Sequence, residues 1–289
     1  MKRIILIFAL LLPSTLSAQP VTLRYNLPAA RTLNFKHIES MSALAQTNDG
    51  RSTQFEKSVT RYVRLDFAAS TPSGVEYVFV QDTAVVVDKN PPLVPPKVDI
   101  DNLITKKPIR VKLSPRGTVE GATPLEPLRA EALLGVQGAD AMFARNAAIL
   151  PPVPDRELSP GATWTESSRD TLYPSKELPQ LGRGSGLRIV ENVTTWTVES
   201  RETRHGIACL KLRWEGRVLF EEKILFAKLE EFTEERSSIE GSMYVDIATG
   251  IPVSLDVKTD KESTRALFGD QNNVLPSSVS TIVTLELIP

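Results

Sequence analysis

Few side chains in this sequence are suited to nucleophilic or metal chemistry. Its 289 residues include two histidines, His37 and His205, and one cysteine, Cys209. A protein zinc site takes three or four His, Cys or carboxylate ligands, with close spacing in at least one pair. No His-x-His, His-x-x-x-His or Cys-x-x-Cys pattern occurs. The sequence therefore predicts no metal ligands, no catalytic residues and no cofactor.

The remaining chemical patterns are a glycine-rich string and the acidic residues. The string GRGSG at 182–186 does not match the Gly-x-Ser-x-Gly elbow of serine hydrolases, and no Lys-Ser or Lys-Thr follows it to bind phosphate. A glycosidase needs only two carboxylates, about 5 to 10 Å apart, and the chain has 35 acidic residues. We expect a protein that is not an enzyme, with a carboxylate-based hydrolase as an alternative.

The first residues predict export. Lys2 and Arg3 precede an apolar run, Ile4–Leu12, and small and polar residues lead to Ala18. A basic start followed by a short apolar run is typical of a signal peptide. The run is shorter than the roughly 20 apolar residues that cross a bilayer, and no cysteine follows it for lipid attachment. We expect cleavage after Ala18, no transmembrane segment, and a periplasmic or secreted protein.

The charge balance argues against nucleic-acid binding. Removal of residues 1–18 takes away Lys2 and Arg3, so 34 − 2 = 32 basic residues remain beside 35 acidic ones, a net charge of −3. A nucleic-acid binder clusters Lys and Arg to displace the counterions of phosphate groups. We therefore predict no nucleic-acid partner.

Alternating side chains predict strands through most of the chain. Val59, Val63, Leu65 and Phe67 are separated by polar or aromatic residues, and this period of two is typical of a strand with one apolar face. Glycine ends the turns between strands, because these positions require a positive φ that other residues adopt at a cost. The predicted turn glycines are Gly74, Gly117, Gly206 and Gly250.

The two halves of the chain repeat one layout. VKLSPRGTVEG at 111–121 and VDIATGIPVSL at 245–255 both suggest a strand, a turn and a strand, and repetition at a fixed spacing indicates an internal duplication. Strand-rich chains can also repeat such a spacing by chance. We predict a mainly β fold of two related antiparallel β-meander or half-barrel units with a short helical segment between them. Four residue pairs are 132 to 134 positions apart: Val59 and Val193, Gly74 and Gly206, Gly117 and Gly250, and Pro28 and Pro160.

Composition sets the expected boundaries. Residues 127–148 place apolar side chains at helical intervals. FEEKILFAKLEEFTEERSSIE at 220–240 could be a helix, but its neighbours are strands, so we favour two long strands around a polar turn. The predicted units are a signal peptide at 1–18, a first β unit at 19–122 with a Pro-rich connector at 91–108, a helical or linker segment at 123–153, and a second β unit at 154–289.

Two stretches resemble known families. MYVDIATGIPVSLDV at 243–257 resembles the strand, Asp-x-x-Thr-Gly-x-Pro turn and strand of LolA-type envelope lipoprotein carriers, and this resemblance implies a soluble carrier. VPDRELSPGATW at 153–164 is similar to a central segment of an uncharacterised family of exported bacterial β-rich proteins, which implies export and a β architecture. The matching residues are Asp246, Thr249, Gly250 and Pro252 in the first stretch, and Pro154, Leu158, Gly161 and Trp164 in the second.

The apolar strand faces lead to a functional expectation. Each face must be covered by the other unit, by the helical segment or by a ligand. We expect an exported binding protein that carries an apolar small molecule or lipid in the bacterial envelope, with Tyr62, Trp196 and Leu134 lining the cavity. The alternative is a structural or protein-interaction module that binds another envelope protein and whose apolar faces are satisfied internally.

Overall fold

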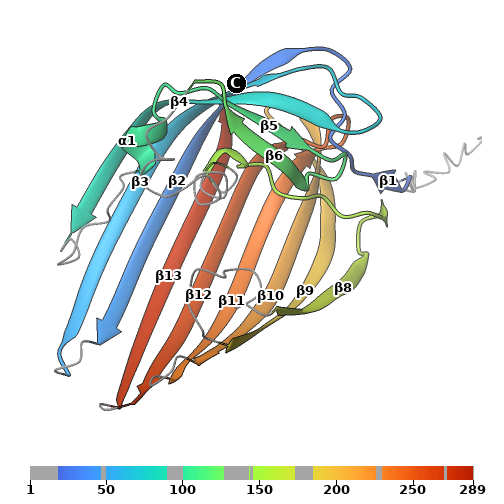
Figure 1. The fold of residues 1–289 in the computed structure, drawn as a ribbon. Helices are drawn as coiled ribbons and strands as arrows, with labels where there is room; N and C mark the ends of the chain where they lie inside the picture. Colours follow the sequence, from blue (N-terminus) through green and yellow to red (C-terminus); the bar gives the residue numbers. More distant parts are fainter. Residues whose placement is uncertain are drawn as a thin grey trace, which may run out of the picture.

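One large sheet dominates the molecule (Figure 1). The computed structural model describes residues 19–46, 50–89, 100–126, 143, 146–172, 185–225, 230–269 and 272–288. In this part of the chain the large sheet has eleven strands, all antiparallel to their neighbours: β2 (Arg31–Gln46), β3 (Ser52–Phe67), β4 (Val75–Lys89), β5 (Ile109–Leu113), β6 (Val119–Pro124), β8 (Thr163–Leu172), β9 (Ser185–Arg204), β10 (Ile207–Leu225), β11 (Glu230–Asp246), β12 (Pro252–Phe268) and β13 (Asn273–Ile288).

The strand order joins the beginning and the end of the chain. Across the sheet it is β6-β5-β4-β3-β2-β13-β12-β11-β10-β9-β8. Most strands pair with their neighbours in sequence, but β2 pairs with β13, and Ile38 lies opposite Thr284. The prediction of a mainly β, antiparallel fold is confirmed, and both halves of the chain contribute to a single sheet. The two remaining strands, β1 (Val21–Thr22) and β7 (Glu157–Leu158), pair with each other.

Helix is scarce in the described residues. The helix α1 (Ile100–Ile104) follows β4, and Phe143 and residues 146–147 are also helical. The remainder of the helical region predicted at 127–148, and the predicted signal peptide at 1–18, lie outside the described residues. Residues 220–225 end β10 and residues 230–240 begin β11, as we favoured, and the predicted turn between them lies outside the described residues. Within the described ranges, no helix has the length and apolar character needed to cross a membrane.

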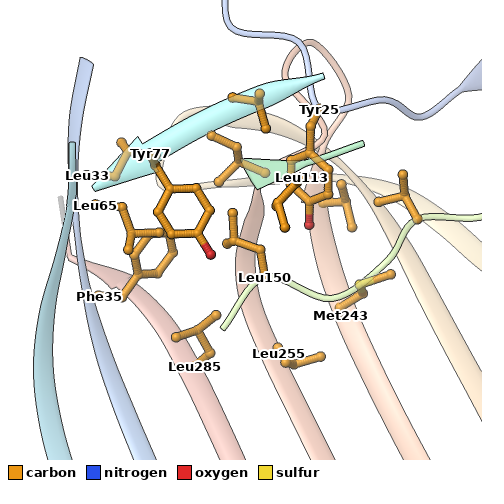
Figure 2. Close-up of a cluster of buried hydrophobic side chains, with 14 of the residues drawn as sticks. Tyr25, Leu33, Phe35, Leu65, Tyr77, Leu113, Leu150, Met243, Leu255 and Leu285 are labelled. Atoms are coloured by element: carbon orange, nitrogen blue, oxygen red, sulfur yellow. The ribbon is translucent and has the colours of Figure 1, made fainter. Parts of the chain in front are cut away.

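The core lies on one face of the large sheet, here called the inner face, and at one end of the strands, here called the upper end. Phe35, Leu65, Met243, Leu255 and Leu285 point from different strands into this core and are buried. Figure 2 shows Leu113 and Leu150 facing them from β5 and from the segment before β7. Each fully buried side chain of this size contributes about 1.5 to 3 kcal/mol, so this end of the sheet holds the fold together.

The N-terminal segment, residues 23–27, is hydrogen-bonded to two turns at the upper end of the sheet. The Tyr25 N–H donates to the Pro115 carbonyl at 2.8 Å, and the Asn26 N–H donates to the Thr249 carbonyl at 2.9 Å. The Tyr25 hydroxyl also donates to the Pro151 carbonyl at 2.6 Å. These turns are the β5–β6 and β11–β12 connections, the same two that the sequence pairs as repeats.

The turn glycines have the predicted conformation. Gly74, Gly117, Gly206 and Gly250 have φ values of 139°, 85°, 76° and 73°. The internal duplication stays a prediction. Val59 is buried on the inner face, whereas Val193, its partner at a spacing of 134 residues, lies opposite Arg217 on the other face.

Candidate functional site

The inner face extends well beyond the core. Residues directly opposite each other in neighbouring strands point to the same face, so the registers of β2, β3 and β9–β13 show which side chains lie below the core. This part of the sheet, which also carries serine, threonine, lysine and glutamate side chains, is here called the lower inner face, and its apolar side chains are half-buried. They are Met41, Phe55, Val190, Val218, Phe220, Ile239, Val257, Val279 and Val283.

A row of tryptophans forms the upper boundary of this surface. Trp164, Trp196 and Trp214 lie opposite one another on β8, β9 and β10. Their ring centroids are 6.0 Å apart for Trp164 and Trp196 and 5.0 Å apart for Trp196 and Trp214. Gly241 on β11 leaves room for the Trp214 indole, because a Cβ there would lie 2.1 Å from that ring. The Trp196 Nε1–H is buried and has no acceptor among the described residues.

Ion pairs border the lower end of the same surface. The Arg188 Nη2 donates to Glu222 Oε1 at 2.6 Å, and the Arg188 guanidinium lies 5.6 Å from the centre of the Phe220 ring. On β11 and β12, Arg265 contacts Glu231 at 2.6 Å and Lys261 contacts Glu235 at 3.2 Å. All these side chains share the inner face with Val218 and Ile239. The lower inner face therefore alternates half-buried apolar side chains with polar and charged ones: Lys57 lies opposite Met41, and Lys261 lies opposite Val279.

A buried charged cluster lies beside this surface and fixes α1 to the sheet. Arg61 on β3 donates to Asp101 through Nε at 2.5 Å and Nη2 at 3.1 Å, and through Nη1 to Glu39 at 2.8 Å. The same Nη1 lies 3.1 Å from His37 Nδ1. Burial, reinforced by the Arg61 charge, lowers the pKa of His37 to about 4, so the imidazole is neutral near pH 7. It can therefore accept the hydrogen bond from Arg61.

The contacts of this cluster indicate a structural role. Gln81 donates through Nε2 to the Asp101 carbonyl at 3.0 Å and to Thr105 Oγ1 at 2.9 Å. Its Oε1 is buried without a partner among the described residues. Every charged member already has an opposite charge within hydrogen-bond distance, and no nucleophile accompanies His37. The arrangement holds α1 against β3 and β4.

The structure does not bring the predicted ligand-binding residues together. Trp196 is half-buried on the inner face of β9. Tyr62 is 41% exposed on the opposite face of β3, and the strands β2 and β13 to β10 separate it from Trp196 in the sheet. Leu134 lies outside the described residues. Sequence reasoning missed Val218, Phe220 and Ile239; alternation along β10 and β11 was the available signal, but the acidic residues around them obscured it.

The outer face, opposite the inner one, has a groove of its own. It has a volume of about 270 Å³ and lies over β2, β3, β4 and β13. Three of its serines have hydrogen-bond partners, since the Ser40 and Ser58 hydroxyl oxygens are 3.2 Å apart and Ser280 donates to Asp260 at 2.6 Å. Its lining thus includes one serine pair, and Val87 and Ile282 add apolar side chains to it.

No reactive group accompanies these surfaces in the described part of the chain. Cys209 is buried in the core, and burial raises the pKa of its thiol, so it is a packed apolar side chain and a poor nucleophile. His205 is exposed in the β9–β10 turn. Across the described ranges, no three His, Cys, Asp or Glu side chains gather closely enough to hold a metal ion. The geometry suits binding of an apolar or amphipathic molecule.

The comparisons with known proteins leave the family open. No protein-family model and no curated protein matches the sequence. Among solved structures, Neisserial surface protein A has a TM-score of 0.21 at 5% identity, with 88% of this chain and 96% of that chain covered. Salmonella typhi OmpF in complex with daunomycin has 0.25 at 7% identity, covering 91% and 99%. Pseudomonas aeruginosa OpdF in complex with glucuronate has 0.25 at 7% identity, covering 89% and 98%.

Proposed function

We propose that this protein is a non-enzymatic binding protein that carries an apolar molecule or lipid in the bacterial envelope. One observation carries the proposal: half-buried apolar side chains lie on the lower inner face, and the core beneath β5 and β6 covers only the upper end of the whole inner face. Apolar side chains that gather on one exposed face of a sheet often mark a binding surface. The signal-peptide pattern at residues 1–18 supports export to the periplasm or beyond.

The dimensions of the surface suit a lipid acyl chain. From Glu39, at the edge of the core, β2 continues to Gln46, a length of about 23 Å at about 3.3 Å per residue. The hydrocarbon core of a bilayer is about 30 Å thick, so one leaflet's chains span about 15 Å. The ion pairs of Arg188 and Arg265 lie where the polar end of such a molecule would emerge.

Binding of a fluorescent fatty acid tests this proposal directly. We expect a dansyl-labelled fatty acid to bind the purified protein with increased, blue-shifted emission. Val218→Lys replaces an apolar side chain of the lower inner face with a charge and should weaken binding at least tenfold, by about 1.4 kcal/mol or more. Leu219→Lys is the matched control, because Leu219 is the next residue of β10, is also half-buried, and points to the opposite face.

A native mass measurement identifies the natural occupant. Protein purified from its own host should carry an additional mass of a few hundred daltons that is absent from the Val218→Lys variant. An apo mass for the wild type, together with equal probe binding by both lysine variants, would contradict the proposal. Circular dichroism of both variants checks that each retains the β fold.

A further inference from the structure

One edge of the large sheet is open over part of its length. β5 pairs with residues 75–79 of β4. Next along the same edge, the Lys106 N–H donates to the Gln81 carbonyl at 2.7 Å. Beyond Gln81, nothing in the described part of the chain pairs with this side of β4. Among the described residues, 83–89 therefore have no backbone partner on this side, and this segment is here called the β4 edge.

The β4 edge has the composition of a strand that pairs. Its first five residues, TAVVV at 83–87, are strongly β-forming and uncharged, and Asp88 and Lys89 follow them. Val85, Val86 and Val87 are 56%, 40% and 52% exposed. Long, apolar, exposed edges are templates for pairing with another chain, and proteins usually protect them with charges. The opposite edge of the sheet, β8, is protected in this way by Glu166, Arg169 and Asp170.

We propose that the β4 edge pairs with the same edge of a second copy of this chain and joins two sheets into one across a twofold axis. An axis perpendicular to the sheet makes the two β4 strands antiparallel and keeps their faces aligned. With the axis at Val86, Val86 lies opposite its counterpart and Val85 lies opposite Val87 of the other copy. Four valines then meet on the outer face.

Charge complementarity supports a second copy as the occupant. Asp82 lies at one end of the β4 edge and Lys89 at the other, and both point to the outer face. The antiparallel arrangement places Lys89 of one copy beside Asp82 of the other at both ends of the pairing. Asp88 lies opposite Ala84, so the register sets no like charges against each other. Both ends are available, since Asp82 and Lys89 make contacts of only 4.0 Å and 3.9 Å within one chain.

Cysteine cross-linking tests the register. Cross-strand partners have Cα atoms about 4.5 to 5.5 Å apart, within the range that a disulfide bridges. Val86→Cys should give a covalent dimer on mild oxidation of the purified protein. Asp88→Cys should not, because the two introduced thiols would be roughly 13 Å apart along the strand at about 3.3 Å per residue. Adding Ala84→Cys to Asp88→Cys should restore the cross-link. The native Cys209 is buried and does not interfere.

Sedimentation tests the association itself. The wild type should show a concentration-dependent dimer, because about seven paired residues on each side form a small interface. Val86→Lys sets two lysines opposite each other on the axis and should weaken the dimer about tenfold or more. Ser168→Lys on the exposed β8 edge should leave it unchanged. A wild type that stays monomeric and a Val86→Cys variant that does not cross-link would overturn the proposal, as would cross-linking of Val86→Cys only to another protein.

Discussion

His37 stands beside Arg61 in a buried position, and this couples stability to pH. Its pKa falls from 6.5 in the unfolded chain to about 4 in the folded one, chiefly through burial and secondarily through the Arg61 charge. Glu39 and Asp101 act in the opposite direction. Between these two pH values the unfolded state binds a proton that the folded state does not, so stability falls as the pH falls through this window.

The expected loss is at most about 3 kcal/mol between pH 6.5 and pH 4. Urea unfolding at a series of pH values measures it, and His37→Gln should flatten the curve over this window alone. A wild-type curve that runs parallel to the His37→Gln curve would show that the imidazole is protonated in the folded protein. The acid-induced loss of carboxylate interactions, which both proteins share, cancels in the comparison.

The buried ion pair between Arg61 and Asp101 should matter far more than an exposed one. Both side chains are nearly buried, with 11% and 7% of their surface exposed. Asp101→Asn leaves Arg61 with Glu39 alone and should destabilise the fold by about 3 kcal/mol. Asp66→Asn is the control, because Asp66 pairs with Arg64 of the same strand at the surface and should cost less than about 1 kcal/mol. Equal losses in thermal unfolding would contradict the assigned role of the cluster.

At the scale of elements, two turn glycines allow two costs of adding a side chain to be measured separately: the strain of a positive φ and the clash with neighbouring backbone. Gly206 and Gly250 have nearly equal φ values of 76° and 73°. A Cβ at Gly206 meets nothing within 4 Å, whereas one at Gly250 would lie 2.3 Å from the Arg24 carbonyl oxygen. Gly206→Ala should therefore cost about 1 kcal/mol, the strain of the positive φ alone.

Gly250→Ala should cost several times more, because the backbone of residues 24–25 must move away and the hydrogen bond between Asn26 and Thr249 is strained with it. Urea denaturation of the two variants gives the difference. If the two variants lose similar amounts of unfolding free energy, residues 23–27 can move away from Gly250 at little cost. The N-terminal segment would then be weakly packed at the upper end. The prediction thus tests whether residues 23–27 belong to the core.

The elements themselves were largely predictable, because local chemistry determines them. Alternation along 59–67 predicts β3, and positive-φ glycines predict the turns at Gly74, Gly117, Gly206 and Gly250, all of which the structure contains. The choice of strands is also confirmed for 220–225 and 230–240, although the glutamates there favour helix. There, pairing with β9 and β12 outweighs the intrinsic preference of the residues.

The candidate site was less predictable, because the face that a residue occupies depends on register. A shift of one residue reverses every side chain of a strand. Bulges interrupt the register of β3 with β4 at Tyr62 and of β9 with β10 near Lys211. Tyr62 and Trp196 are 134 positions apart, as Val59 and Val193 are, yet they face opposite sides of the sheet. No local pattern records such bulges.

At the scale of the whole molecule, the pairing of β2 with β13 decides the architecture. It joins residues such as Phe35 and Leu287, which lie near opposite ends of the chain, and both are buried in one core. Contacts of such sequence separation leave no periodic signal in a single sequence. These contacts also close the largest loops in the chain, and closing a longer loop costs more conformational entropy. We therefore expect the pairing of β2 with β13 to form late in folding.

The uneven distribution of the core should appear as a gradient of stability along each strand. Amides near Leu212 and Met243 lie within the core, whereas those near Glu222 and Thr233 lie at the lower end of the same two strands, β10 and β11. Few buried apolar contacts and exposed hydrogen bonds allow local opening. Hydrogen exchange followed by mass spectrometry should therefore show slow exchange at the upper end and faster exchange toward the lower end, although the two strands pair along their whole length.

Ligand binding should remove part of this gradient. A fatty acid seated on the lower inner face of the sheet covers Val218 and Phe220 and should slow exchange in the lower halves of β9–β12, with little change at the upper end. The Val218→Lys variant should keep its gradient under the same conditions. If exchange is uniform along β10 and β11 without ligand, the lower half is stabilised independently of any occupant, and the outer groove, with its paired serines, becomes the better place to look for a bound molecule.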